Sequence, residues 1–418
     1  MDAVSENSTV AQNAIRELRG RGPEGLRALL NAHAEAIKQH EANRKLAADR
    51  LQPDESWQRL RAALDGVSAQ RDCHASKLFW FTDFEQAKAA AKASAKPILS
   101  LRLLGKLDEE FSCANSRFFR TTLYANAEIA RYLDEHFVLH WKSVRPVPKV
   151  TIDFGDGRKL ERTLTGNSIH YVIDADGHVI DALPGLYGPQ TFLRELRRAE
   201  DVANAAVKLT GESRDSALRE FHRTRFTALN TEYAADLQRV SLAEKPGQIN
   251  GISIAPGAAP TALAAGRLAG SKGKVEMPIL RRTANAEDDA IWQRIGDLHA
   301  DSARVDESSK ALIRDKAPTA IAAARITTGK AFVENPVLRQ IRILERSISE
   351  DTARNEYLFH TKLHEWLASG GAPVNVDQLN AKVYVELFLT PDSDPWLGLR
   401  PDDAFAALEN DGIVLNKH

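Results

Sequence analysis

The segment Lys96-Pro97-Ile98-Leu99-Ser100-Leu101-Arg102-Leu103-Leu104 decides the fold of this chain. Its residues 98–104 are mostly apolar, which is typical of a largely buried strand. An Ala- and Lys-rich stretch precedes the strand and is typical of a helix, for which Thr82 and Glu85 have the spacing of a capping box. Pro97 ends this helix. We therefore expect a helix that leads directly into a central strand.

The residues that follow extend this strand into a sheet. Residues 137–141 (FVLHW) predict a second strand, after a helical stretch. Gly155-Asp156-Gly157 and Asp176-Gly177 each separate two strand-like runs, which predicts two hairpins. Gly188-Pro189 then opens a closing helix. This order predicts an α/β fold with a mixed sheet and helices on both faces.

Four pieces of the segment from Trp80 to Leu209, about a third of the chain, carry a family resemblance. They are residues 95–99 (AKPIL), the motif Cys113-Ala114-Asn115-Ser116, residues 126–138 (NAEIARYLDEHFV), and residues 174–177 (DADG). In this order and spacing they resemble the thioredoxin-like superfamily. The resemblance implies a thioredoxin-like sheet and a cysteine at the start of a helix.

The resemblance makes Cys113 a candidate nucleophile. Unpaired N–H groups and the helix dipole favour a thiolate at a helix start, and a thiolate attacks a disulfide, a sulfenic acid or a peroxide. The family motif is Cys-x-x-Cys, but here Ser116 takes the second position and makes the motif CxxS. A serine can donate a hydrogen bond to the thiolate but cannot resolve a mixed disulfide.

Three further residues complete this candidate site. Ser168 aligns with the family's cis-proline, which lies beside the cysteine in space. His170 follows it and, like His140, is a candidate to lower the pKa of the thiol or to act as a base. Cys73 precedes the domain and is the candidate resolving thiol. The hairpin around Gly155 is an insertion relative to a minimal thioredoxin, so we expect it at the edge of this site.

Other features favour a domain without catalysis. Ser112 replaces the aromatic residue that commonly precedes the cysteine, and Asp108, Glu109 and Glu110 bring negative charge that opposes thiolate formation. The leading hypothesis is a single-cysteine thiol-disulfide oxidoreductase acting on a protein or small-molecule substrate. The alternative is a non-catalytic thioredoxin-like scaffold that binds a protein partner.

A third hypothesis is a metal site in the C-terminal part. Glu356, His360 and His364 recur every four residues on an expected long helix, so they share one face. Two imidazoles at this spacing can chelate zinc. The sequence identifies no further ligand, and a solvated polar face has the same pattern.

Composition narrows the class of protein. The 418 residues hold 56 Lys and Arg against 57 Asp and Glu, and this balance gives no electrostatic reason to expect nucleic acid. No apolar run is long enough for a membrane helix, and the polar N-terminus lacks the apolar region of a signal peptide. With only two cysteines and no membrane signal, we expect a cytoplasmic protein. We also expect no bound cofactor. The sequence does not indicate the oligomeric state.

The expected organisation has three parts. Residues 1–76 form a helical N-terminal extension, residues 77–209 the thioredoxin-like domain, and residues 210–418 a mainly helical C-terminal domain. A flexible Gly/Ala/Pro-rich loop is expected near 247–274. Asn335-Pro336 begins a helix that we expect to continue to Ser369.

Overall fold

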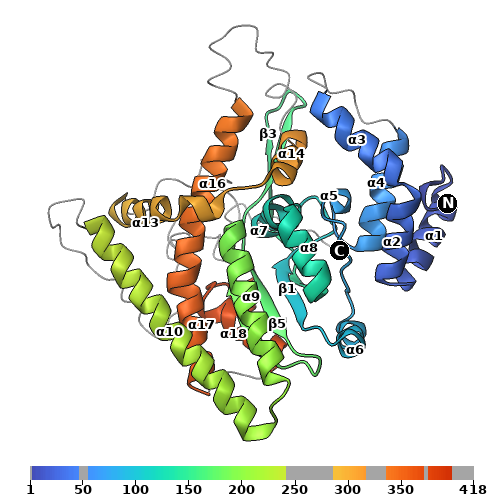
Figure 1. The fold of residues 1–418 in the computed structure, drawn as a ribbon. Coiled ribbons are helices and arrows are strands. Elements are labelled where there is room, and N and C mark those ends of the chain that lie inside the picture. The colour runs from blue at the N-terminus through green and yellow to red at the C-terminus, as the bar shows by residue number, and fades with distance from the viewer. Residues whose placement is uncertain (1, 47–54, 242–285, 317–335, 371–374, 398–418) are drawn as a thin grey trace.

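The computed structural model describes residues 2–46, 55–241, 286–316, 336–370 and 375–397 of the chain (Figure 1). The loop expected near 247–274 lies outside these ranges. The described part confirms a mixed α/β fold with helical regions on both sides of the sheet-forming segment in the sequence. Within it, no helix has the length and apolarity needed to cross a membrane.

A four-stranded mixed sheet forms the centre of the fold. Its strands are β1 (Ile98–Leu104), β2 (Val138–Arg145), β5 (Ser168–Ile173) and β6 (Val179–Pro184), in the order β2-β1-β5-β6. Strand β1 pairs parallel to β2 and antiparallel to β5, which pairs antiparallel to β6. All residues of β1, β5 and β6 are buried, as the apolar runs predict. This sheet is compatible with a thioredoxin-like arrangement.

Both predicted hairpins are confirmed. Strands β5 and β6 form the one inside the main sheet. The other, formed by β3 (Lys149–Asp153) and β4 (Lys159–Thr163), is a separate two-stranded sheet. Gly155 and Gly157 in its turn have φ values of 75° and 89°, a left-handed conformation that glycine adopts without a steric penalty.

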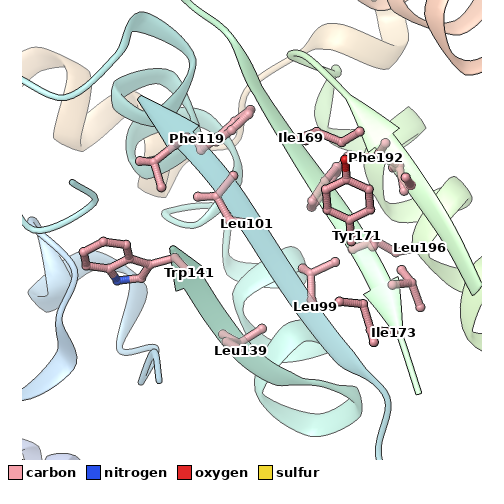
Figure 2. Close-up of a cluster of buried hydrophobic side chains, with 14 of the residues drawn as sticks. Leu99, Leu101, Phe119, Leu139, Trp141, Ile169, Tyr171, Ile173, Phe192 and Leu196 are labelled. Atoms are coloured by element: carbon pink, nitrogen blue, oxygen red, sulfur yellow. The ribbon is translucent and has the colours of Figure 1, made fainter. Parts of the chain in front are cut away.

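Helices of the central segment pack on the main sheet. They are α6 (Phe84–Ser94), α7 (Ala114–Phe118), a π-helical turn at Phe119–Leu123, α8 (Ala127–His136) and α9 (Pro189–Ala206). Figure 2 shows the buried cluster in which Phe192 and Leu196 of α9 join Leu99, Leu101 and Tyr171 of the strands. The predicted capping box before α6 is wrong. Asp83 is the N-cap instead and accepts a hydrogen bond from Gln86 N at 2.9 Å, because the helix begins one residue later than Thr82 requires.

The N-terminal helices have a hydrophobic cluster of their own. They are α1 (Ser8–Gly20), α2 (Pro23–Ala32), α3 (Ala34–Leu46), α4 (Glu55–Ser68) and α5 (Cys73–Ser76), coloured blue in Figure 1. Leu26, Leu29, Leu60 and Leu64 lie at the centre of this cluster, which also contains Cys73.

The C-terminal region is helical, and part of it packs on the sheet. Its helices are α10 (Gly211–Ser241), α13 (Ala286–Leu298), α14 (Glu307–Lys316), α16 (Pro336–Arg354), a π-helical turn at Asn355–His360, α17 (Thr361–Ala368) and α18 (Val376–Glu386). The predicted long helix is confirmed, because α16, the π turn and α17 run without a break from 336 to 368. Leu363 of α17 and Val383 of α18 belong to the same hydrophobic cluster as the strands.

Candidate functional site: two buried polar clusters

Cys113 caps the short helix α7, so it stands at a helix start as the resemblance implies. Its side chain is fully buried in the hydrophobic cluster of the sheet. The adjacent backbone is also occupied: Cys113 N–H donates to the Leu104 carbonyl at 3.2 Å, and Ala114 N–H donates to the Thr165 carbonyl at 2.9 Å. A reactive thiolate needs partial exposure, and Cys113 has none in this conformation.

The two serines predicted for the site lie close to it in the chain and in the sheet. The Ser116 hydroxyl is 2.6 Å from Ser112 Oγ and 2.9 Å from the Cys113 carbonyl oxygen. Ser168 is the first residue of β5, and its buried hydroxyl has no hydrogen-bond partner.

His170 bonds to a tyrosine that lies near the thiol. Its Nε2 is 2.6 Å from the Tyr124 hydroxyl, and burial lowers the pKa of His170 to about 3. Burial, and then the charge of Cys113, raise the pKa of Tyr124. At physiological pH, His170 is therefore neutral as well as fully buried, which is typical of a histidine that packs in a core. The other candidate, His140, lies 2.8 Å through Nδ1 from Ser100 Oγ on β1, and its pKa is likewise lowered to about 3, mainly by burial.

The C-terminal region covers the loop before β5. The Tyr384 hydroxyl of α18 donates to the Asn167 carbonyl at 3.1 Å, and Asn167 Nδ2 donates to Thr390 Oγ1 at 3.0 Å. Arg145 of β2 donates to the carbonyl oxygens of residues 390, 391 and 394. The charge of Cys113 contributes to the raised pKa of Tyr384, after burial, so this tyrosine also lies near the thiol. The C-terminal region of the chain therefore covers the loop that the resemblance places beside the cysteine.

The base of the β3–β4 hairpin covers the cysteine loop from another direction. Thr163 Oγ1 donates to the Ser112 carbonyl at 3.2 Å and accepts from Arg117 Nη2 at 2.9 Å. The ammonium of Lys149 lies 5.0 Å from the centre of the Phe111 ring. The predicted place of the hairpin, beside the cysteine, agrees with these contacts.

Cys73 lies in a different part of the molecule. It belongs to the hydrophobic cluster of the N-terminal helices, and Cys113 belongs to that of the sheet. Neither cysteine forms a disulfide, and both are buried. The backbone N–H of Cys73 donates to Asp65 Oδ1 at 2.9 Å, and burial raises the pKa of its thiol.

A second buried cluster forms where α10 and α17 meet β6. His360 and His364 come together there with Asp181, and one ligand atom from each lies within 4.8 Å of the others. His360 Nε2 is 3.5 Å from Asp181 Oδ1, and the two histidine rings are 4.2 Å apart between centroids. His364 Nδ1 is 2.9 Å from Nδ1 of His222, on α10. All four side chains are buried.

Glu356, which the sequence places with these histidines, lies outside this ligand cluster. Its Oε1 accepts a hydrogen bond from Arg194 Nη2 at 2.9 Å. The π-helical turn at Asn355–His360 changes the register between residues 356 and 360, so their side chains are not spaced as on a regular α-helix.

The sequence pattern did not identify Asp181 and His222 as members of this cluster. Asp181 follows the hairpin turn in a short apolar strand, and His222 lies far away on the long helix α10. The one available signal was a charged residue inside the buried run Val179-Ile180-Asp181-Ala182, because a buried carboxylate requires a partner.

Comparison with known proteins adds no assignment to either cluster. No known protein family matches the chain, and neither a curated protein nor a solved structure matches it.

Proposed function

We propose that the central domain is a thioredoxin-like scaffold that binds a protein partner and does not use Cys113 in catalysis. This proposal rests on one observation: segments of the same chain cover the loops on either side of Cys113. Tyr384 bonds to Asn167, the residue before Ser168, and Thr163 bonds to Ser112, the residue before Cys113. A disulfide or peroxide substrate would have to displace these contacts before it reached the sulfur.

The β3–β4 hairpin offers a surface for a partner. Its two strands pair with each other and with no other strand of the described chain, so their outer edges have unpaired backbone groups. Such edges are templates for strand addition by a second protein. Phe154, which directly follows β3, is 55 % exposed and is the most exposed aromatic side chain of the described residues. The partner we propose contributes an extended segment that pairs with this hairpin.

The decisive experiment has two readouts on the full chain. The first is the rate at which iodoacetamide modifies Cys113 as a function of pH, in a Cys73→Ser background. An unperturbed thiol titrates near pH 8.5, and we expect slow modification with a midpoint at or above that value. Fast modification with a midpoint well below it would favour the thiol-disulfide oxidoreductase instead.

The second readout is retention of a co-purified partner. We expect Cys113→Ser to retain the partner, and Phe154→Ser to lose it. Ile343→Ser is the matched control, because Ile343 is equally exposed, at 54 %, but lies on α16. Loss of the partner with Cys113→Ser, or equal loss with both surface variants, would contradict a scaffold that uses the hairpin.

A further inference from the structure

We propose that Asp181, His360 and His364 bind one divalent metal ion, of which Zn²⁺ is the best match. This inference goes beyond the scaffold function and does not depend on it. The three side chains converge from β6 and from the π-helical turn and α17 that follow α16, and all are buried.

The separations of the ligand atoms suit zinc. Zn–N and Zn–O bonds of about 2.0–2.2 Å in a tetrahedron place neighbouring ligand atoms roughly 3.3–3.6 Å apart. His360 Nε2 and Asp181 Oδ1 are already 3.5 Å apart. The complete set lies within 4.8 Å, so ion binding requires a contraction of about 1 Å, which side-chain rotation can supply.

The hydrogen bond with His222 orients His364 as a ligand. His364 Nδ1 lies 2.9 Å from His222 Nδ1, so one of the two rings carries the shared proton. With that proton on His364 Nδ1, the lone pair of His364 lies at Nε2, which is buried and has no hydrogen-bond partner. Fixing a ligand histidine through its other nitrogen is typical of metal sites.

The cluster brings possible metal ligands together without enough hydrogen-bond partners. Asp181 Oδ1 accepts a hydrogen bond from Ala182 N–H at 2.8 Å, but both ring nitrogens of His360 are buried without a partner. Each neutral imidazole has one N–H and one lone pair. Among the described residues, His360 is the one basic side chain within ion-pairing distance of Asp181. A divalent ion would take lone pairs from His360 Nε2, His364 Nε2 and Asp181 together and would balance the buried carboxylate, with the ring protons on the Nδ1 atoms.

The donor set and the burial distinguish among metals. Two imidazoles and one carboxylate suit zinc and also suit iron(II) centres, which need open positions for oxygen and substrate. The ligands are 2 % exposed or less, so the site is closed to oxygen and substrate, which favours zinc over an iron(II) centre. One further position remains for water, and Tyr187, packed edge-on against His360 with a buried hydroxyl that has no hydrogen-bond partner, supplies a polar neighbour.

The test is metal titration of the full chain after removal of bound ions with a chelator. We expect one equivalent of Zn²⁺ by calorimetry. We expect one equivalent of Co²⁺ to give the visible absorption of a tetrahedral N/O site, without the intense charge-transfer band of a thiolate ligand. In ¹⁵N-histidine spectra of the wild-type chain, two imidazoles should shift when zinc is added. Absence of stoichiometric binding, a thiolate band, or a site that takes iron(II) and not zinc would overturn the proposal.

Variants identify the ligands. Asp181→Asn and His364→Gln should each weaken zinc binding by more than about 100-fold, because loss of a ligand exceeds the 10–100-fold cost of losing an outer partner. His178→Gln is the matched control: His178 pairs with Asp174 at 3.1 Å but is partly exposed and outside the cluster. Wild-type affinity in Asp181→Asn would overturn the assignment. If a variant does not fold, the wild-type cobalt and ¹⁵N spectra still decide.

Discussion

Cys113 and His364 are equally buried, yet their surroundings differ in one chemical respect. Around Cys113, the buried polar atoms without a hydrogen-bond partner in the described chain include the amide of Asn115 and the hydroxyl of Ser168. Amides and hydroxyls both donate and accept, so a water molecule can satisfy them. Around His364, the corresponding atoms are both ring nitrogens of His360 and Nε2 of His364, which lie with the carboxylate of Asp181 in one set of possible metal ligands.

This comparison separates two kinds of burial. A buried polar group that can both donate and accept needs only water or a neighbouring side chain. Converging acceptors repel one another and need a proton or a cation, because an unpaired buried charge costs several kcal/mol. Cys113 thus lies in a closed region of the fold, whereas His364 lies in the cluster for which we propose an ion.

Zinc removal should have the largest effect on stability. An ion that binds only the folded chain stabilises it by about 4 kcal/mol when free zinc exceeds the dissociation constant 1,000-fold. We expect a chelator to lower the free energy of unfolding by about this amount, measured by denaturant titration with and without zinc. Asp181→Asn should remove the difference and Cys113→Ala should preserve it. Equal stability with and without zinc would mean that the His364 cluster binds no stabilising ion and does not differ from the Cys113 region in this respect.

Acid should destabilise the Cys113 region through His170. Burial lowers the pKa of His170 to about 3, while an unfolded histidine titrates near 6.5. Between these values the unfolded chain binds a proton that the folded chain does not, so stability falls as pH falls. The contribution is about 1.4 kcal/mol per pH unit. We expect His170→Gln to reduce the slope of unfolding free energy against pH, measured from pH 6.5 to 4.

Tyr124→Phe separates the two causes that act on His170. This variant removes the hydrogen bond to Nε2 and leaves the imidazole buried. Since burial is the cause of the low pKa, the pH slope should persist while stability at neutral pH drops by about 1 kcal/mol. A flattened slope in Tyr124→Phe would show that the hydrogen bond, and not burial, keeps His170 neutral.

Local patterns predicted the elements of the fold well. The run of residues 98–104 became β1, and the glycine turns at 155–157 and 177 became hairpins, because turn geometry and apolar alternation are local properties. The capping box failed because Asp83 competes with Thr82 for the same helix start, and a carboxylate is a strong cap.

The candidate sites were harder to predict because they depend on contacts distant in the sequence. The closure of Cys113 depends on Tyr384, 271 residues further along the chain. The histidine cluster joins residues 181, 222, 360 and 364, and the helix spacing revealed only the last two. Glu356 shared their spacing, but the π-helical turn and the competing Arg194 removed it from the set.

The smallest predicted effect concerns the closure itself. Tyr384→Phe removes the 3.1 Å hydrogen bond to the Asn167 carbonyl without creating a cavity, which should cost about 1 kcal/mol. If this bond holds the segment closed over Cys113, local opening becomes about fivefold more frequent, and alkylation of Cys113 should accelerate by the same factor in a Cys73→Ser background. Tyr357→Phe is the control, because its buried hydroxyl bonds to Asp236 in a separate cluster. Equal acceleration in both variants would mean that the thiol is reached by global unfolding, and that α18 does not act as its cover.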